Sequence, residues 1–94
     1  MASTNEYLTY TLDLLREIEG ISYKKMMGEY ILYYNEIIFG GIYDNRFLVK
    51  KVAQLEKYNL KEEIPYPNAK NMYLIDIEDS RLIKEIILEL VNNL

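Results

Sequence analysis

The apolar residues of this chain are spaced as in a helix at both ends and as in strands in the middle. Near the N-terminus, four of them fall on one stripe at steps of four and three: Leu8, Leu12, Leu15 and Ile18. This is the spacing of an amphipathic helix. The Ser-x-x-Glu sequence starting at Ser3 has the spacing of a capping box, and Gly20 supplies the left-handed position at which many helices end. The pattern predicts a helix over Asn5–Glu19.

A second helical pattern lies at the C-terminal end and is the clearest in the chain. Its apolar residues repeat at steps of one and three: Leu82, Ile83, Ile86, Ile87, Leu90, Val91 and Leu94. Asp79 or Ser80 can cap this helix. We expect a helix of about 14 residues with a broad apolar stripe that packs on a sheet.

The stretch Lys24–Lys51 between them is dense in aliphatic and aromatic residues. Asn35-Glu36 and Asp44-Asn45 interrupt it, and short breaks of this kind are typical of β-hairpins. The stretch is predicted to form three antiparallel strands joined by two tight turns. The turns set the register, which places Tyr34 opposite Ile37 and Tyr43 opposite Arg46.

Strand alternation divides the side chains of this stretch between two faces. One face carries Tyr30, Leu32, Tyr34, Ile37, Phe39, Tyr43 and Leu48. The other carries Met27, Ile31, Tyr33, Ile38, Ile42, Phe47 and Val49. Neither face is polar, so both are expected to be covered, by helices or by another molecule. Gly40 and Gly41 fall within a strand, which predicts a bulge or a group passing close over the backbone.

The segments after this stretch are shorter. Val52–Tyr58 has the spacing of a two-turn helix. Ile64–Tyr66 is a candidate short edge strand next to two prolines, which favour extended backbone. Met72–Ile77 is a better candidate strand, able to pair with Ile64–Tyr66 or with the edge of the central sheet. The fold class is α+β.

Composition restricts the functions open to this chain. Its 94 residues make one domain, residues 1–94, with a net charge of −4 and a pI near 4.8, an unfavourable background for nucleic acid and anionic membranes. No apolar run is long enough to span a membrane, and no signal peptide is apparent, so we expect a cytoplasmic protein. The absence of His and Cys excludes the usual nucleophile systems and zinc sites.

The charged pairs of the sequence have simple structural explanations. Lys24-Lys25 and Lys50-Lys51, with Arg46, are candidate nucleic-acid contacts, but we expect the two lysine pairs to lie apart and to bind no nucleic acid directly. Glu62-Glu63 and the acidic group Asp76, Glu78 and Asp79 match no metal-loop pattern. Helix capping explains Glu78 and Asp79. We therefore predict no catalytic residue, no metal, no cofactor and no enzymatic activity.

Several motifs resemble those of one known family. They are Lys25-Met26-Met27-Gly28-Glu29-Tyr30, Leu32-Tyr33-Tyr34, Phe39-Gly40-Gly41-Ile42-Tyr43-Asp44, Phe47-Leu48-Val49-Lys50 and Pro65-Tyr66-Pro67-Asn68-Ala69-Lys70. The chain resembles the N-terminal domain of the TfoX/Sxy family of bacterial competence regulators, in a short single-domain form. The resemblance implies an α-β(3)-α-β(2)-α layout, with an antiparallel sheet backed by the N- and C-terminal helices. Asn68 stands where the family usually has Gly.

The resemblance implies a regulatory role and no catalytic residues. Full-length members add a helical C-terminal domain and act with a transcription activator, and this chain has no room for that domain. We expect a cytoplasmic protein-interaction domain with a regulatory protein partner and no direct DNA binding. The alternative is a small-ligand binder with a cavity between helix and sheet near Gly40-Gly41.

The ten tyrosines point to an interface, since tyrosine is enriched at protein contacts. Half-buried strand positions also favour this residue, so most of the ten are expected to be structural. With two apolar faces to cover, the chain is predicted to form a homodimer. If their face is the outer one, the interface residues are Tyr30, Tyr34, Phe39 and Tyr43.

Overall fold

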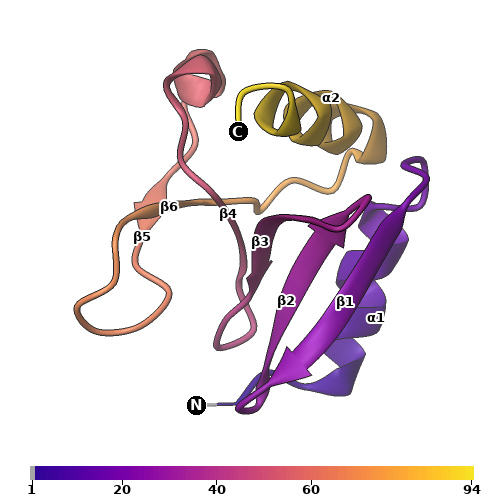
Figure 1. The fold of residues 1–94 in the computed structure, drawn as a ribbon, viewed down its shortest axis with the longest axis vertical. Coiled ribbons are helices and arrows are strands. Elements are labelled where there is room, and N and C mark those ends of the chain that lie inside the picture. Colours follow the sequence, from indigo (N-terminus) through magenta and orange to yellow (C-terminus); the bar gives the residue numbers. More distant parts are fainter. Residues whose placement is uncertain (1) are drawn as a thin grey trace.

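One six-stranded antiparallel sheet forms the centre of the fold, and both α-helices pack on the same face of it (Figure 1). The computed structural model describes residues 2–94. The strands are β1 Ile21–Met26, β2 Glu29–Tyr34, β3 Ile37–Ile42, β4 Phe47–Val49, β5 Glu62–Glu63 and β6 Met72–Leu74, in the spatial order β1-β2-β3-β4-β6-β5. The helices are α1 Asn5–Leu14, α2 Ser80–Val91 and the 3-10 helix η1 Ala53–Tyr58. The predicted α+β class is confirmed.

The central stretch contains parts of four strands, so the prediction of three was wrong. An additional hairpin turn at Met27-Gly28 joins β1 to β2, and both residues have positive φ, 52° and 82°. Met27 lies in this turn and is 97% exposed, so it belongs to neither sheet face. The sequence pattern does not indicate this turn, because apolar residues on both sides of Gly28 continue the pattern of a strand.

The two predicted turns and their register are confirmed. Tyr34 pairs with Ile37, and Tyr43 and Arg46 exchange backbone hydrogen bonds of 2.9 and 3.0 Å. Both residues of each turn have positive φ, as a two-residue turn of type I′ requires.

A bulge in β3 confirms one part of the glycine prediction and corrects the assignment of faces. Leu32 pairs with Gly40 and Tyr33 with Ile38, so one residue of β3 is unpaired. The extra residue reverses the alternation after it. The helix-side face therefore collects side chains from both predicted faces: Tyr30, Leu32, Phe39, Ile42, Phe47 and Val49.

The helices cover this face. Their buried apolar residues join the same core: Leu8, Leu14, Leu15 and Ile18 from the first segment, and Ile83, Ile86, Ile87 and Leu90 from α2. Asp79 caps α2, accepting the backbone N–H of Arg81 at 3.0 Å and that of Leu82 at 3.2 Å. At α1 the cap is Thr4, one residue beyond the predicted Ser3, and its hydroxyl accepts the Tyr7 N–H at 3.1 Å.

Two short elements differ from the prediction. Residues 53–58 form a 3-10 helix rather than an α-helix. The edge strand is β5, Glu62–Glu63, because Pro65 and Pro67 provide no N–H for a ladder at the predicted position Ile64–Tyr66. β6 is shorter than Met72–Ile77, but it pairs with both β4 and β5.

Candidate functional site

The sheet face opposite the helices, here called the open face, carries an unusual number of apolar side chains. Strand pairing and alternation place on it the apolar residues Met26, Ile31, Tyr33, Ile38, Tyr43, Leu48, Met72 and Leu74 and the polar residues Ser22, Lys24, Glu29, Arg46, Lys50 and Glu63. Met26 and Ile38 are 48% and 41% exposed. No helix among the described residues covers this face.

A loop covers part of the open face. Leu48 is fully buried although it lies outside the helix-side core, and the loop of residues 64–71 lines a hollow on this face together with Ile38, Tyr43 and Lys50. Within the loop, Asn68 has a φ of 71°, so it adopts the left-handed conformation that Gly adopts readily. The ring of Tyr66 lies 6.3 Å from that of Tyr43, centroid to centroid.

Arg46 holds this loop against the sheet. Its guanidinium donates to Glu63 Oε1 at 2.8 Å and to the carbonyl oxygens of Ile64 and Pro65 at 3.1 and 3.2 Å. The bond to Arg46 is the main reason that the pKa of Glu63 lies below its ordinary value. Arg46, a candidate nucleic-acid contact in the sequence, is therefore occupied by a structural role.

Gly41 allows the Tyr43 ring to lie across the backbone of β3. A Cβ on Gly41 would come 2.8 Å from Cε2 of Tyr43 and 2.6 Å from the carbonyl oxygen of Tyr30. The close approach predicted over this glycine is thus confirmed. Burial raises the pKa of the Tyr43 phenol, and the neighbouring Tyr66 and Glu29 add to the rise.

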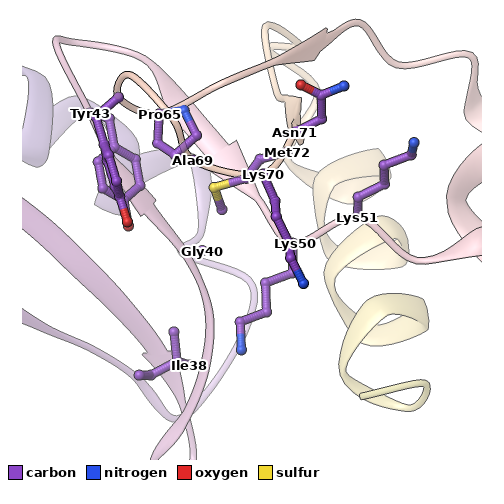
Figure 2. Close-up of a pocket in the computed structure, with 11 residues that line it drawn as sticks. Ile38, Gly40, Tyr43, Lys50, Lys51, Pro65, Ala69, Lys70, Asn71 and Met72 are labelled. Atoms are coloured by element: carbon purple, nitrogen blue, oxygen red, sulfur yellow. The ribbon is translucent and has the colours of Figure 1, made fainter.

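Two hollows on the open face have both Tyr43 and Tyr66 in their lining. One has a volume of about 460 Å³, and its lining includes Ile38, Gly40, Tyr43, Lys50, Lys70 and Met72 (Figure 2). The other, about 360 Å³, is lined by Met26, Met27, Glu29, Ile31, Tyr43, Pro65 and Tyr66. Together they extend an apolar and aromatic surface across the sheet.

The lysines of the first hollow differ in their partners. Lys51 forms an ion pair with Glu62 at 3.0 Å, and this bond is the largest cause of the lowered pKa of Glu62. Lys50 and Lys70 have no acidic partner within 4.0 Å among residues 2–94. Lys24-Lys25 lie on β1, separated from Lys50-Lys51 by β2 and β3, so the two pairs do not merge.

Glu29 organises one end of the sheet. Its carboxylate accepts the backbone N–H and the hydroxyl of Ser3 at 3.0 and 2.5 Å, and the Asp44 N–H at 3.0 Å. Asn45 takes part in the same cluster: it accepts the Thr4 N–H at 2.9 Å and donates its own N–H to the Ser3 hydroxyl at 3.0 Å. The N-terminal segment is thus joined to two hairpin turns.

The four predicted interface residues do not share an outer face. Tyr30 and Phe39 are buried in the helix-side core, and Tyr34 is partly buried against it, so the condition that made them interface residues is not met. Tyr43 alone lies on the open face, because the bulge in β3 separates it from the others. Nothing in the sequence pattern indicates that Tyr66 and Lys70 lie at this surface, since no periodicity fixes the position of a proline-containing loop.

The cavity predicted between helix and sheet near Gly40 also changes place. The helix side is filled by fully buried side chains, and the hollow that Gly40 lines lies on the open face. Among residues 2–94, no group of three acidic side chains is arranged to hold a metal ion. In the described part of the chain, neither α-helix has the length and apolar character needed to cross a membrane.

Comparison with known proteins identifies the family. The sequence model of the TfoX N-terminal domain matches residues 13–78. The chain belongs to the TfoX N-terminal domain family. It is also similar to a Spirochaeta aurantia protein described as an uncharacterised 12.7 kDa protein in the trpE 5′ region, with 32% identity over 78 residues, 81% of this chain and 68% of the relative.

Family membership suggests a competence-related regulatory domain. The structure gives a reason for several motif residues that the chain shares with this family. Gly28 forms the β1–β2 turn, Glu29 joins the N-terminus to the Asp44 turn, and Gly41 accommodates the Tyr43 ring. These residues build the fold, whereas Lys50, Tyr66 and Lys70 face the surface.

Proposed function

We propose that this chain is a cytoplasmic protein-interaction domain of the regulatory kind, and that its partner binds the open face. The exposed apolar side chains of that face carry the proposal. An antiparallel sheet that ended at water would normally present polar residues there. Contiguous exposed apolar surface marks interaction sites, and aromatic residues and Met are enriched at protein contacts.

Site-specific photocrosslinking in the native cell tests this proposal. A photoreactive benzoylphenylalanine at Ile38 lies on the open face, and the same residue at Lys84, on α2, is the matched control. We expect a protein adduct from position 38 and none from position 84. Mass spectrometry of the adduct then shows whether the partner is a second copy or a different protein. No adduct from Met26, Ile38 or Tyr66 would contradict the proposal.

The proposal includes no direct DNA contact. The net charge of −4 opposes DNA binding. The lysines of β1 are separated from those after β4 by the strands β2 and β3. We expect the isolated protein to bind duplex DNA only non-specifically, with affinity that falls steeply as salt is raised. Submicromolar, sequence-dependent binding in physiological salt would contradict this part.

Small-ligand binding is the second candidate, and the hollow lined by Gly40 is the observation that favours it. Its volume of about 460 Å³ falls within the range of ligand sites, roughly 300–1,000 Å³. A thermal-shift screen with cellular metabolites tests this function. Ile38 lines this hollow and is exposed, so a rise in melting temperature that the change Ile38→Asp does not abolish would place the ligand elsewhere.

A further inference from the structure

We propose that the segment bound on the open face is acidic as well as apolar, with a carboxylate that reaches Lys50 and Lys70. This inference rests on the proposed function and names the chemistry of the partner. Three observations support it: the sign of the unpaired charges, the direction of two lysine side chains, and the apolar hollow beside them.

The unpaired charges that lie on the open face in β1 and directly after β4 are cationic, although the protein as a whole carries −4. Lys24 and Lys50 have no acidic partner within 4.0 Å in the described chain. The acidic side chains of the same strands are already occupied. Glu29 binds backbone N–H groups, and Glu63 is paired with Arg46 and Lys61.

Lys50 and Lys70 approach the same hollow from different segments. Lys50 follows β4 and Lys70 belongs to the loop, and Figure 2 shows the Lys70 side chain extending toward Lys50 and the Lys50 side chain extending toward Ile38. Glu62, the acid that pairs with Lys51, is held at 3.0 Å by both Lys51 and the Asn71 amide. Since no acidic side chain of the described residues pairs with Lys50 or Lys70, a partner's carboxylate in this hollow would be attracted by both charges.

The second hollow supplies the apolar part of the site. Met26, Ile31 and Tyr66 line it, and the Tyr43 ring separates it from the lysines. A peptide crossing the sheet over Tyr43 would place an apolar side chain on one side of the ring and a carboxylate on the other. Both hollows are open, which suits an extended chain better than an enclosed small molecule.

Charge also distinguishes this occupant from a second copy. In a two-fold contact whose axis passes close to this hollow, each Lys50 and Lys70 would approach the corresponding lysines of the other copy. Like charges facing one another oppose association. An acidic segment of another protein replaces this repulsion by attraction.

Selection from a phage-displayed library of random dodecapeptides tests the inference on the intact chain. The selections use wild type, the double variant Lys50→Glu/Lys70→Glu, and the control Arg81→Glu/Lys84→Glu, which makes the same charge change on α2. We expect wild type and control to enrich peptides that combine Asp or Glu with aromatic or aliphatic residues. A synthetic peptide from this pool should bind the Lys50/Lys70 variant about tenfold or more weakly, and its affinity for wild type should fall with added salt.

The outcomes separate this inference from the proposed function. One outcome would overturn the inference alone. In it, the selected peptides do not bind the Ile38→Asp variant, but they show no excess of Asp or Glu, or they bind the Lys50→Glu/Lys70→Glu variant as tightly as wild type. Peptides unaffected by Ile38→Asp would overturn both, because they bind elsewhere. Failure to enrich any peptide, with a crosslinked adduct from position 38 that proves to be a second copy, would also overturn the inference. Circular dichroism of each variant confirms that it is folded.

Discussion

The carboxylate of Glu29 accepts the backbone N–H of Asp44 at 3.0 Å, and this bond joins the start of β2 to the turn between β3 and β4. The same carboxylate binds Ser3. Glu29 lies in the Met-Met-Gly-Glu-Tyr motif, so the most recognisable segment of the sequence serves to hold the N-terminal segment and a hairpin turn together. Residues that bind a partner are therefore expected among the surface side chains that take no part in this cluster.

Glu29→Gln should destabilise the fold. The amide group that replaces one oxygen cannot accept the N–H groups it would face, and an unsatisfied donor costs about 1–3 kcal/mol. Urea unfolding should show a lower free energy of unfolding by about this amount. Glu36→Gln, an exposed turn residue, is the control and should have little effect. Equal stability of the two variants would show that the Glu29 cluster contributes nothing.

Gly41→Ala should also lower the free energy of unfolding, by about 1–3 kcal/mol as expected for overpacking. The new Cβ would meet the Tyr30 carbonyl oxygen and the Tyr43 ring. Adding Tyr43→Ala should recover only part of the loss, because the contact with the carbonyl remains. Full recovery in the double variant would mean that the ring is the only obstacle.

Arg46→Met should release the loop over residues 64–71. The aliphatic part of the side chain is kept, while its hydrogen bonds to Glu63, Ile64 and Pro65 are lost. Hydrogen exchange should become faster in residues 64–71 and stay unchanged in α2. Unchanged exchange in the loop would show that packing of Tyr66 on Tyr43 holds it instead.

The stability difference between wild type and Arg46→Met should depend on pH. Arg46 lowers the pKa of Glu63 below 4.5 in the folded protein, so the contribution of the pair is fully present above pH 4.5. It should decrease as the pH falls through the lower folded-state pKa. Urea unfolding of both proteins between pH 7 and pH 3 measures the difference. A constant difference across this range would contradict the ion pair.

Ile87→Asp should unfold the chain. Ile87 is fully buried, and an unpaired carboxylate there costs several kcal/mol against a total stability of about 5–15 kcal/mol. Leu94→Asp is the matched control, because Leu94 belongs to the same predicted stripe but is 52% exposed. Circular dichroism and a melting curve compare them. A cooperative melt of Ile87→Asp at the wild-type temperature would contradict the burial of this face.

The homodimer stays a prediction, and since an acidic partner is proposed for the open face, a dimer formed through that face should be weak and should depend on salt. The apolar part of the open face favours self-association, whereas Lys50 and Lys70 oppose it, so added salt should increase the dimer fraction by screening the repulsion. Light scattering coupled to gel filtration at micromolar concentrations measures this. A mass of 11.2 kDa that does not change with salt or concentration would contradict the dimer.

The sequence predicted the parts of the fold that local rules determine. Asn35-Glu36 and Asp44-Asn45 gave the correct turns, and the apolar steps in α2 gave the correct buried face, because turn geometry and helical periodicity depend on neighbouring residues. The glycines Gly40-Gly41 predict a bulge or a close contact, but strict alternation takes no account of the residue that a bulge adds. Strict alternation therefore assigns Ile42, Phe47 and Val49 to the face opposite to the one that they occupy.

The candidate site was less predictable, because it is formed by segments far apart in the chain. Tyr43 and Tyr66 come from different segments and lie together where Arg46 bonds to the loop, and Lys70 lines the same hollow as Lys50. Nothing in the spacing of these residues indicates that they are neighbours. Tyr30 and Phe39 are predicted at an interface but lie in the core. The sequence pattern of an aromatic residue in a strand is the same whether a helix of the same chain or a partner protein covers it.

The two sides of the proposed binding surface differ in how firmly they are built. The floor belongs to β2, β3 and β4, whose strands pair along their length except at the bulge in β3, while Tyr66 and Lys70 belong to a loop that the Arg46 guanidinium holds. Loops open at lower free energy than paired strands. A partner that contacts Tyr66 therefore stabilises the loop as it binds, and part of its binding energy is used to restrict the motion of this wall. Substitutions at Arg46 will then change the affinity for partners that never touch it.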